Sequence, residues 1–473
     1  MNKFIASFLF FIVSFQVSFA KSVDENTAKI ICYNFCKSEG LQATPSDLTL
    51  AYAPTTVING TSVTDFYVFN LSSTGFVIVS GDDNIIPVLA YSTESSFNAG
   101  YIPTGISGWL GNYQTQINYV IKNNIAAPVT TVAKWSELAR GNTRSAAKTA
   151  LGAAPLLKSL WNQDPYYNDM CPYDAGAGKH AVTGCVATAM AQVMKYWNWP
   201  RVGVGSHSYN SSYGLLSANF GTTYYQWDSM PNAVAYNNVA VAKLNSDAGI
   251  SVNMSYSTVE SGAFVNENTS PITNCAEYAL KTYFRYKSST LQGVFRAEYD
   301  DTAWVHLLKY EIDAGRPAIY TGDGSSGGHC WVADGYANAD RIHFNWGWGG
   351  YCNGYYIVEN LTPGGTDFSN GNTLMTGIMP DTIAAAGVNE IAFGTALNVY
   401  PNPARQEINI DIHGTNCSQI RVIDLAGREM KKIAPAANAG IVTLQLNDYA
   451  DGMYFVEMTS AEGVITKKIV VAK

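Results

Sequence analysis

The sequence predicts an α+β protein that ends in a separate, smaller β-sandwich. Two kinds of pattern lead to this fold class. Apolar residues recur at helical spacing in several stretches, most clearly over residues 185–197, and short apolar strands separated by turns fill much of the remainder. From residue 397 onward only short strands follow one another, about 75 residues in all, which is typical of a small sandwich domain.

Length, charge and cysteine content narrow the possible classes. The chain has 473 residues, enough for two to four domains. Its 29 basic and 37 acidic residues give a formal net charge of −8, so nothing in the charge indicates nucleic acid as a partner. Eight cysteines are spread over the whole length without paired Cys-x-x-Cys motifs, which favours neither a disulfide scaffold nor a structural zinc site. We expect no metal and no cofactor.

Residues 1–20 have the pattern of a secretory signal peptide. Lys3 precedes an apolar run that reaches Val17, and small residues lead up to Ala20. A membrane anchor is the alternative, but the run is short for a span and is interrupted by polar residues. We expect cleavage after Ala20 and an exported, soluble mature protein.

Residues 21 to about 125 predict one compact α+β unit. Its expected elements are a helix over 23–40, strands over 65–71, 75–80 and 85–91, and a helix whose apolar positions run from 106 to 121. Residues 126–154 are small and polar and include Arg140, Arg144 and Lys148, which is the composition of an exposed, cleavable connector. Such a connector indicates either a propeptide boundary or an ordinary interdomain linker.

Residues 155 to about 380 predict the second unit. Helices are expected over 185–197, 276–283 and 301–314, and strands over 318–321, 329–336, 341–345 and 354–358. The stretch 201–256 is rich in Gly, Asn, Ser and Tyr, so we expect long loops there. A second linker over 381–396 leads to the C-terminal strands, expected over 408–412, 420–424, 441–446, 453–458 and 465–471.

Cys185 opens the helix that organises the second unit. Val186, Met190, Val193 and Trp197 follow it on one helical face, so the cysteine lies in the first turn. Unpaired N–H groups and the positive end of the helix dipole there favour a thiolate. The alternative interpretation is a small buried cysteine at the start of a core helix.

A nucleophilic cysteine needs a base, and His329 is the best placed of the six histidines. It follows two glycines and lies 144 residues after Cys185, a separation typical of papain-like enzymes. The next strand ends at Asn345, which can orient the imidazole, and Trp346, which can shield that hydrogen bond. Gln163 can supply an oxyanion donor together with the N–H of Cys185.

Other candidate residues have weaker support. His180 is a rival base, but its closeness to the cysteine in sequence favours a flanking position; histidines 207, 306, 343 and 413 have no accompanying motif. Residues 322–327 match a G-x-G-x-x-G pattern but lead into a strand, so we expect a mobile loop beside His329 instead of a dinucleotide site. Cys330 is expected to face the core on the opposite side of the strand from His329.

Taken together, these motifs resemble the streptopain-type cysteine peptidases of the papain-like clan. The resemblance rests on the Thr183–Ala189 helix start, Gly328-His329, the run Asn345 to Gly350, and Gln163. It implies a papain-like catalytic domain in a secreted zymogen, with an α+β prodomain as intramolecular inhibitor. It also implies an endopeptidase acting on proteins and peptides, with a bulky apolar residue at P2. By position, Ser261, Gly262 and Gly328 resemble the family's substrate contacts, and we add Trp346 to this set.

The C-terminal unit resembles a different family, the sorting domains of the type IX secretion system. The resemblance rests on the Leu397–Ala404 segment, the Asp424–Arg428 turn, Gly452-Met453-Tyr454 and Lys467–Val471. It implies an Ig-like β-sandwich, the outer-membrane secretion machinery as partner, and release or attachment at the bacterial cell surface. An additional adhesive sandwich is the alternative.

We therefore expect a signal peptide over 1–20, an inhibitory propeptide over 21–147, a peptidase domain over 148–380, a linker over 381–396 and a sorting domain over 397–473. Two other functions stay open at this point. One is a binding protein or adhesin on a degenerate peptidase scaffold. The other keeps the nucleophile but transfers acyl groups to amines, as transglutaminase-like enzymes do.

Overall fold

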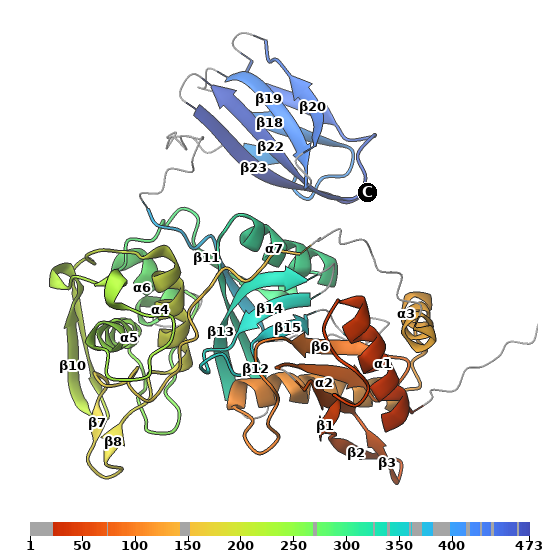
Figure 1. Cartoon of the computed structure of the whole chain (residues 1–473). Helices are drawn as coiled ribbons and strands as arrows, with labels where there is room; N and C mark the ends of the chain where they lie inside the picture. The colour runs from red at the N-terminus through yellow and green to blue at the C-terminus, as the bar shows by residue number, and fades with distance from the viewer. Residues whose placement is uncertain are drawn as a thin grey trace, which may run out of the picture. The chain divides into compact units, whose positions relative to one another are not determined.

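The computed structural model describes residues 22–72, 74–141, 152–267, 272–324, 327–337, 341–358, 361, 371–381, 398–412, 417–425, 428–436, 439–460 and 463–473. The chain divides into two compact units, residues 1–381 and 382–473 (Figure 1). The predicted signal peptide and nearly all of the predicted linker over 381–396 lie outside the described residues.

The N-terminal part of the first unit combines three helices with a sheet. Its elements are α1 (Glu25–Ser38), β1 (Thr49–Tyr52), β2 (Thr55–Ile58), β3 (Thr61–Thr64), β4 (Phe66–Asn70), β5 (Phe76–Ser80), β6 (Val88–Ser92), α2 (Thr104–Lys122) and α3 (Val129–Arg140). Helix α1 begins where the Asp24 carboxylate accepts a hydrogen bond from the Thr27 N–H, at 2.9 Å. The expected helices and strands of residues 21–125 are therefore present, with shifted ends.

The connector predicted over 126–154 is partly helical. Helix α3 ends at Gly141, whose φ of +62° is the left-handed conformation that terminates helices. It is held to the rest of the N-terminal part by Trp135, which is buried, and by Asn34 on α1, which donates a hydrogen bond to the Leu138 carbonyl at 2.6 Å. Residues 142–151, which include most of the predicted cleavage region, lie outside the described residues.

The remainder of the first unit contains the predicted catalytic segments. Its elements are β7 (Tyr173–Asp174), β8 (Lys179–His180), α4 (Cys185–Trp197), β9 (Ser206–Ser211), β10 (Gly214–Asn219), the 3₁₀ turns η1 (Phe220–Thr222) and η2 (Trp227–Ser229), α5 (Val239–Ser251), η3 (Ile272–Asn274), α6 (Ala276–Thr282), β11 (Gln292–Phe295), η4 (Arg296–Glu298), α7 (Asp301–Asp313), β12 (Ala318–Gly324), β13 (Gly327–Ala337), β14 (Arg341–Asn345), β15 (Gly354–Ile357) and β16 (Thr373–Thr376).

The expectation of loops over 201–256 was wrong. This stretch contains the hairpin β9–β10 and the helix α5. Helix α5 has buried residues on nearly every side, including Asn245 and Asp247, so it has no polar face that would reveal a helical period. Of these two buried polar residues, Asp247 accepts hydrogen bonds from Tyr225 and Lys243, and Asn245 donates one to the Val241 carbonyl.

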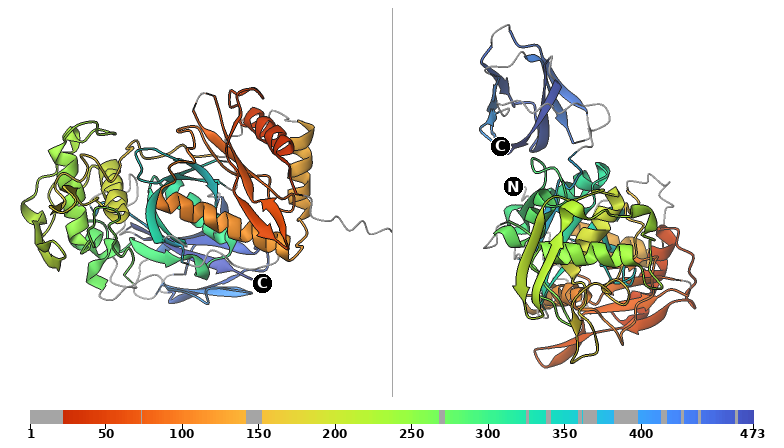
Figure 2. Two further views of the ribbon diagram at one scale, coloured as in Figure 1. Left: turned by 90° about the horizontal axis from the view of Figure 1, so that it is seen from below. Right: turned by 90° about the vertical axis from the view of Figure 1, so that its left-hand side faces the viewer.

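A single antiparallel sheet joins the N-terminal part to the predicted catalytic segments. Its ten strands follow the order β1-β4-β5-β6-β15-β14-β13-β12-β16-β11. The junction is short: β6 and β15 pair Tyr91 with Tyr355 and Ala90 with Tyr356. Helix α2 crosses this sheet against β12 and β13 (Figure 2). The N-terminal part is thus packed against the strand that carries His329.

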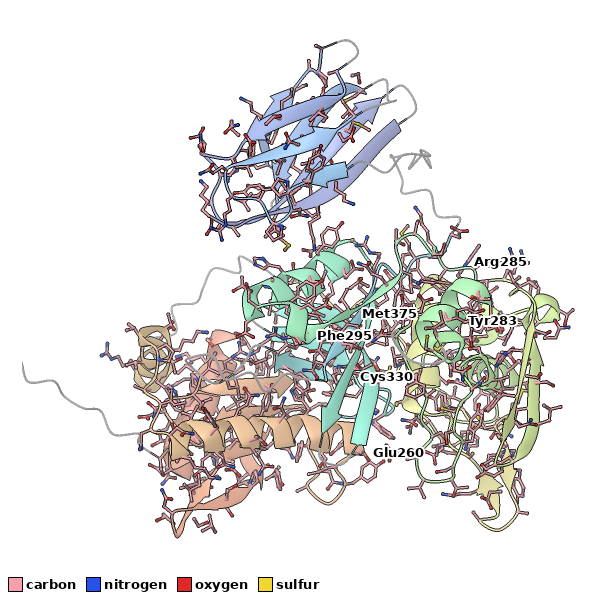
Figure 3. All side chains as sticks on the ribbon, turned by 180° about the vertical axis from the view of Figure 1, so that it is seen from behind. Glu260, Tyr283, Arg285, Phe295, Cys330 and Met375 are labelled. Carbon is pink, nitrogen blue, oxygen red and sulfur yellow. The ribbon has the colours of Figure 1, made fainter. Side chains whose placement is uncertain are left out.

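The two faces of β13 contact different parts of the molecule. Cys330 and Val332 belong to the core formed with α4 and α5, whereas Trp331 and Ala333 belong to the core formed with α2 and α7. Alternation along a strand produces this division. Figure 3 labels Cys330 at the side of the sheet that adjoins the helices of residues 155–290. The expectation that Cys330 is a core residue is met, since only 3% of it is exposed.

The C-terminal unit consists of two small antiparallel sheets around one apolar core. Its strands are β17 (Asn398–Tyr400), β18 (Glu407–Asp411), β19 (Cys417–Asp424), β20 (Glu429–Ile433), β21 (Ile441–Gln445), β22 (Gly452–Ser460) and β23 (Gly463–Val471). The sheet orders are β17-β18-β21 and β20-β19-β22-β23, with Ile408, Ile420 and Val456 among the fully buried residues. The predicted α+β class with a small terminal β-sandwich is confirmed.

Among the helices of the described residues, none has both the length and the apolar character needed to cross a membrane. All eight cysteines are free thiols.

Candidate active site

Cys185 is the first residue of α4, as its position in the sequence predicts. Gly184 directly before it has a φ of +86°, and a Cβ there would lie 2.7 Å from the sulfur of Met254. The tight entry into the helix therefore requires glycine. The carbonyl of Gly184 accepts the Thr188 N–H at 3.0 Å and so starts the helical ladder. The cysteine is half-buried at this point.

The surroundings of the Cys185 thiol hold its pKa above the ordinary value for cysteine. Burial, with a smaller contribution from the nearby Glu260, raises its pKa to about 11, although backbone N–H groups of Cys330 and of the helix start act in the opposite direction. The sequence-based expectation of a thiolate considered only the helix terminus. Desolvation is the larger effect here, because segments distant in sequence cover the site.

His329 lies near the start of β13 with its imidazole on the α2 side of the sheet. Its Nε2 donates a hydrogen bond to the carbonyl oxygen of Trp346 at 3.1 Å. The ring stacks on Trp348, with centroids 5.4 Å apart and planes 10° apart. Among the described residues no hydrogen bond joins this imidazole to the Cys185 thiol.

Gly105 of α2 covers the imidazole. A Cβ built on Gly105 would lie 2.2 Å from Cδ2 and 2.3 Å from Cγ of His329, so only glycine permits this approach. The resulting burial leaves 7% of His329 exposed and lowers its pKa to about 4. Both His329 and Cys185 are therefore neutral near pH 7, and no thiolate–imidazolium pair exists in this arrangement.

Asn345 ends β14, the strand beside β13. Its Nδ2 donates to the Ser159 carbonyl at 2.8 Å, and its Oδ1 accepts from Gln192 at 3.1 Å and from the Gly347 N–H at 3.2 Å. His329 is bonded to the next residue, Trp346, instead of to Asn345. The structure thus places the two predicted partners on adjacent strands without a bond between their side chains.

Gln163 lies beside the segment that leads into α4. Its carbonyl accepts the N–H of Thr183, two residues before Cys185, at 3.2 Å. Gln163 is 5% exposed. The backbone therefore ties the predicted oxyanion donor to the start of the nucleophile's helix.

The four predicted substrate-binding residues have different surroundings. The hydroxyl of Ser261 is buried and donates to the Val182 carbonyl at 2.8 Å, and the backbone of Gly262 pairs with Ser255. Gly328 is exposed on β13. Trp346 is completely buried among other aromatic rings, including Trp331 at a centroid distance of 4.7 Å. In this arrangement Trp346 has no surface to offer a substrate.

Two other histidines are engaged elsewhere. His180 is bonded through Nδ1 to the Cys171 carbonyl at 2.6 Å. His343, which has no motif in the sequence, lies between two carboxylates: Nδ1 is 2.6 Å from Asp334 and Nε2 is 2.7 Å from Glu94. These carboxylates raise the pKa of the buried His343 to about 9, although burial alone would lower it. His413 lies outside the described residues, as do residues 325–326 in the predicted loop beside His329.

Sequence reasoning missed Gly105, Glu94 and Gln192. Gly105 and Glu94 lie more than 200 residues from the histidines they contact, so no local pattern reveals them. For Gln192 a signal existed: it lies seven residues after Cys185 on the same helix, two turns along the face that carries the nucleophile. Within the described residues no group of three or more His, Cys, Asp or Glu side chains is arranged to hold a metal.

Comparison with known proteins matches three family models to the chain. Residues 161–356 match the peptidase C10 family, residues 20–117 match the Spi protease inhibitor, and residues 398–472 match the secretion system C-terminal sorting domain. Streptopain from Streptococcus pyogenes is 31% identical over 354 residues, which cover 67% of this chain and 82% of streptopain. The chain belongs to the C10 family of cysteine peptidases.

Two further relatives agree with this assignment. The thiol protease/hemagglutinin PrtT from Porphyromonas gingivalis is 29% identical over 378 residues. These residues make up 75% of this chain but only 41% of the length of PrtT. Among solved structures, a fragment of prointerpain A from Prevotella intermedia is similar, with a TM-score of 0.53 and 28% identity. The match covers 69% of this chain and 99% of that fragment.

The predicted resemblance and fold class are thereby confirmed. The chain is a secreted cysteine peptidase zymogen with an inhibitory propeptide, and its sorting domain directs export across the outer membrane to a secreted or surface-attached state. We call the N-terminal part, described over residues 22–72 and 74–141, the prodomain.

Proposed function

We propose that this zymogen yields an endopeptidase in which Cys185 attacks the peptide carbonyl and His329 transfers the protons. One observation carries the proposal: β13 bears both His329, under the prodomain helix α2, and Cys330, whose backbone contacts the Cys185 thiol. His329 and the residue that contacts the Cys185 thiol are therefore consecutive on β13. The thiol and the imidazole nevertheless lie toward opposite faces of the sheet.

Removal of the prodomain takes Gly105 away from the imidazole and uncovers His329. Once Gly105 no longer lies on the imidazole, His329 can leave the Trp346 carbonyl and turn to accept the thiol proton. Its other N–H then donates to Asn345 Oδ1, where it replaces the Gly347 N–H. Exposure to water favours the imidazolium, so the pKa of His329 rises, and the positive charge beside Cys185 then lowers the pKa of the thiol. The N–H groups at the start of α4 then stabilise the thiolate.

The chemical steps follow from this pair. The Cys185 sulfur bonds to the substrate carbonyl carbon, and the oxyanion receives hydrogen bonds from the Cys185 N–H and the Gln163 amide. Protonated His329 gives its proton to the leaving amine as the C–N bond breaks. Water, deprotonated by His329, then attacks the thioester and releases the acid product.

Substrate selection completes the proposal. The family resemblance supports a bulky apolar P2 residue and contacts from Ser261, Gly262 and Gly328 to the substrate backbone. Because the Ser261 hydroxyl is bonded to Val182, we assign its contribution to the backbone alone. A set of peptides that differ only at P2 tests the preference; equal kcat/KM for Gly and Leu at P2 would contradict it.

The decisive variant is Cys185→Ala. We expect the full-length variant to retain its fold and to lose both casein cleavage and self-processing. Cys275→Ala provides a matched control, since Cys275 is a buried thiol in the same unit, directly before helix α6. Self-processing by the Cys185→Ala chain would refute the assignment of the nucleophile.

A further inference from the structure

Gln192 is a completely buried polar residue on the helix that begins with Cys185. A buried amide has two donor hydrogens and an acceptor oxygen to satisfy, and leaving them unpaired is costly. Its oxygen accepts hydrogen bonds from the Ser159 hydroxyl at 3.0 Å and the Trp161 N–H at 3.2 Å. Its nitrogen donates to Asn345 Oδ1 at 3.1 Å.

The backbone fixes the polarity of this network. The Trp161 N–H can only donate, so the atom facing it must be the Gln192 oxygen, and the Gln192 NH₂ must face Asn345. Asn345 then presents its oxygen to Gln192 and its NH₂ to the Ser159 carbonyl, at 2.8 Å. The Gly347 N–H lies 3.2 Å from Asn345 Oδ1 and can only donate, so it requires the same orientation of the Asn345 amide.

Gln192 also joins the three segments on which the proposed chemistry depends. It lies two turns along α4 from Cys185, contacts Trp161 two residues before Gln163, and contacts Asn345 directly. The hydrogen bond from the Gly347 N–H connects Asn345 only to a residue two positions further along the chain, so it does not fix Asn345 relative to other segments. The Ser159 carbonyl is itself positioned through the bond from the Ser159 hydroxyl to Gln192. The side chain of Gln192 therefore links the orienting amide and the oxyanion segment to the nucleophile's helix.

We infer that Gln192 is a positioning residue of this peptidase, which holds the Asn345 amide and the Trp161–Gln163 segment in register with Cys185. The inference rests on the proposed function, because it assigns to Asn345 the orientation of the His329 imidazole. In the uncovered site, a correctly turned Asn345 oxygen accepts the imidazolium N–H and stabilises the charged pair over a wider pH range.

The test compares Gln192→Met and Gln192→Glu with wild type. The full chain is allowed to self-process, or is processed in trans by a trace of tagged wild-type enzyme that is then removed. Active sites are counted with a cysteine-directed inactivator, so that loss of folded enzyme does not register as loss of rate. Val193→Ala, a buried apolar change at the next position, is the control for destabilised helix packing.

For Gln192→Met we expect kcat per titrated site to fall roughly 10- to 100-fold, with KM changed less, because the reacting groups are misplaced. The bell-shaped pH profile of kcat/KM should also narrow, with its alkaline limb moved down by about half a pH unit or more. Gln192→Glu should retain more activity at acid pH, where a protonated carboxyl can still donate to Asn345, and lose it as the carboxyl ionises. Val193→Ala should leave both limbs in place.

If Gln192→Met leaves both kcat and the two limbs of the pH profile of kcat/KM unchanged, the inference is overturned. If Cys185→Ala is inactive in the same experiments, the proposed function stands without the role of Gln192. If Cys185→Ala still self-processes, both the proposed function and the inference fail.

Discussion

Gly105 of the prodomain lies flat against the imidazole of His329, so that a single added methyl group would overlap the ring. This contact couples the prodomain to a residue of the proposed catalytic pair. It buries the ring, lowers its pKa, and leaves it bonded to the Trp346 carbonyl on the side of the sheet away from Cys185.

Gly105→Ala should weaken latency. Overpacking of this kind costs about 1 to 3 kcal/mol, so the rate of self-processing should rise roughly 10-fold or more. Gly111→Ala is the matched control, because it makes the same change on α2 where a Cβ meets no atom within 4 Å. Gly111→Ala also gains about 1 kcal/mol of helix propensity, whereas Gly105→Ala, in the first turn of α2, gains less. Equal processing rates for the two variants would show that the Gly105 contact is not part of latency.

The ion pair of Glu94 with His343 links the prodomain to β14. The raised pKa of His343 means that its contribution to stability is fully present below about pH 6.5 and is lost as the pH rises through about 9, up to about 3 kcal/mol. The pKa of Glu94 is lowered; burial opposes this, but hydrogen bonding and charge from His343 outweigh it. Its contribution is therefore lost at acid pH.

Glu94→Gln tests this pair in the inactive Cys185→Ala background. We expect the free energy of unfolding to fall by about 1 to 2 kcal/mol near neutral pH, less than the full pKa shift implies, because Glu94 is partly exposed and Asp334 still pairs with His343. The difference from the parent chain should shrink above pH 9. Glu137→Gln, an exposed change on α3, is the control; an equal effect at both positions would contradict the assignment.

The mature enzyme should begin no later than Ala153. Ala153 pairs with Tyr336 through two backbone hydrogen bonds of 3.0 and 2.9 Å, and the Leu157 N–H donates to the Asp334 carboxylate at 2.9 Å. These bonds make the segment part of the peptidase, since removing it would take the Leu157 N–H away from one oxygen of the buried Asp334 carboxylate, whose other oxygen is bonded to His343. N-terminal sequencing of the processed protein decides this, and a terminus beyond Ala153 would contradict it.

Much of the fold was predictable because its elements have clear periods. Helix α4 has an apolar face, strand β5 lies between Gly75 and Gly81, and β13 begins at Gly327-Gly328. Helix α5 was missed because nearly all its sides are buried, and α3 because its one deeply buried residue, Trp135, gives no periodic signal. The joining of β6 to β15 is a long-range pairing that no local pattern encodes.

The candidate site was predictable in its residues but not in its state. Cys185, His329, Asn345 and Gln163 follow from sequence motifs, and their roles remain proposals. The protonation of the cysteine was not predictable, because it depends on burial by segments far away in the chain. The same holds for His343, whose charge depends on Glu94, 249 residues earlier.

The measurement that tests the account most directly is the rate of alkylation of Cys185 as a function of pH, before and after removal of the prodomain. Mass spectrometry of the modified peptide separates Cys185 from the other thiols. In the full-length chain, with the pKa of Cys185 raised to about 11, we expect very slow alkylation at pH 6 that increases through alkaline pH. In the processed enzyme, we expect rapid and selective alkylation already at pH 6. Equal, slow alkylation of Cys185 in both forms would contradict the claim that the prodomain silences a thiolate nucleophile.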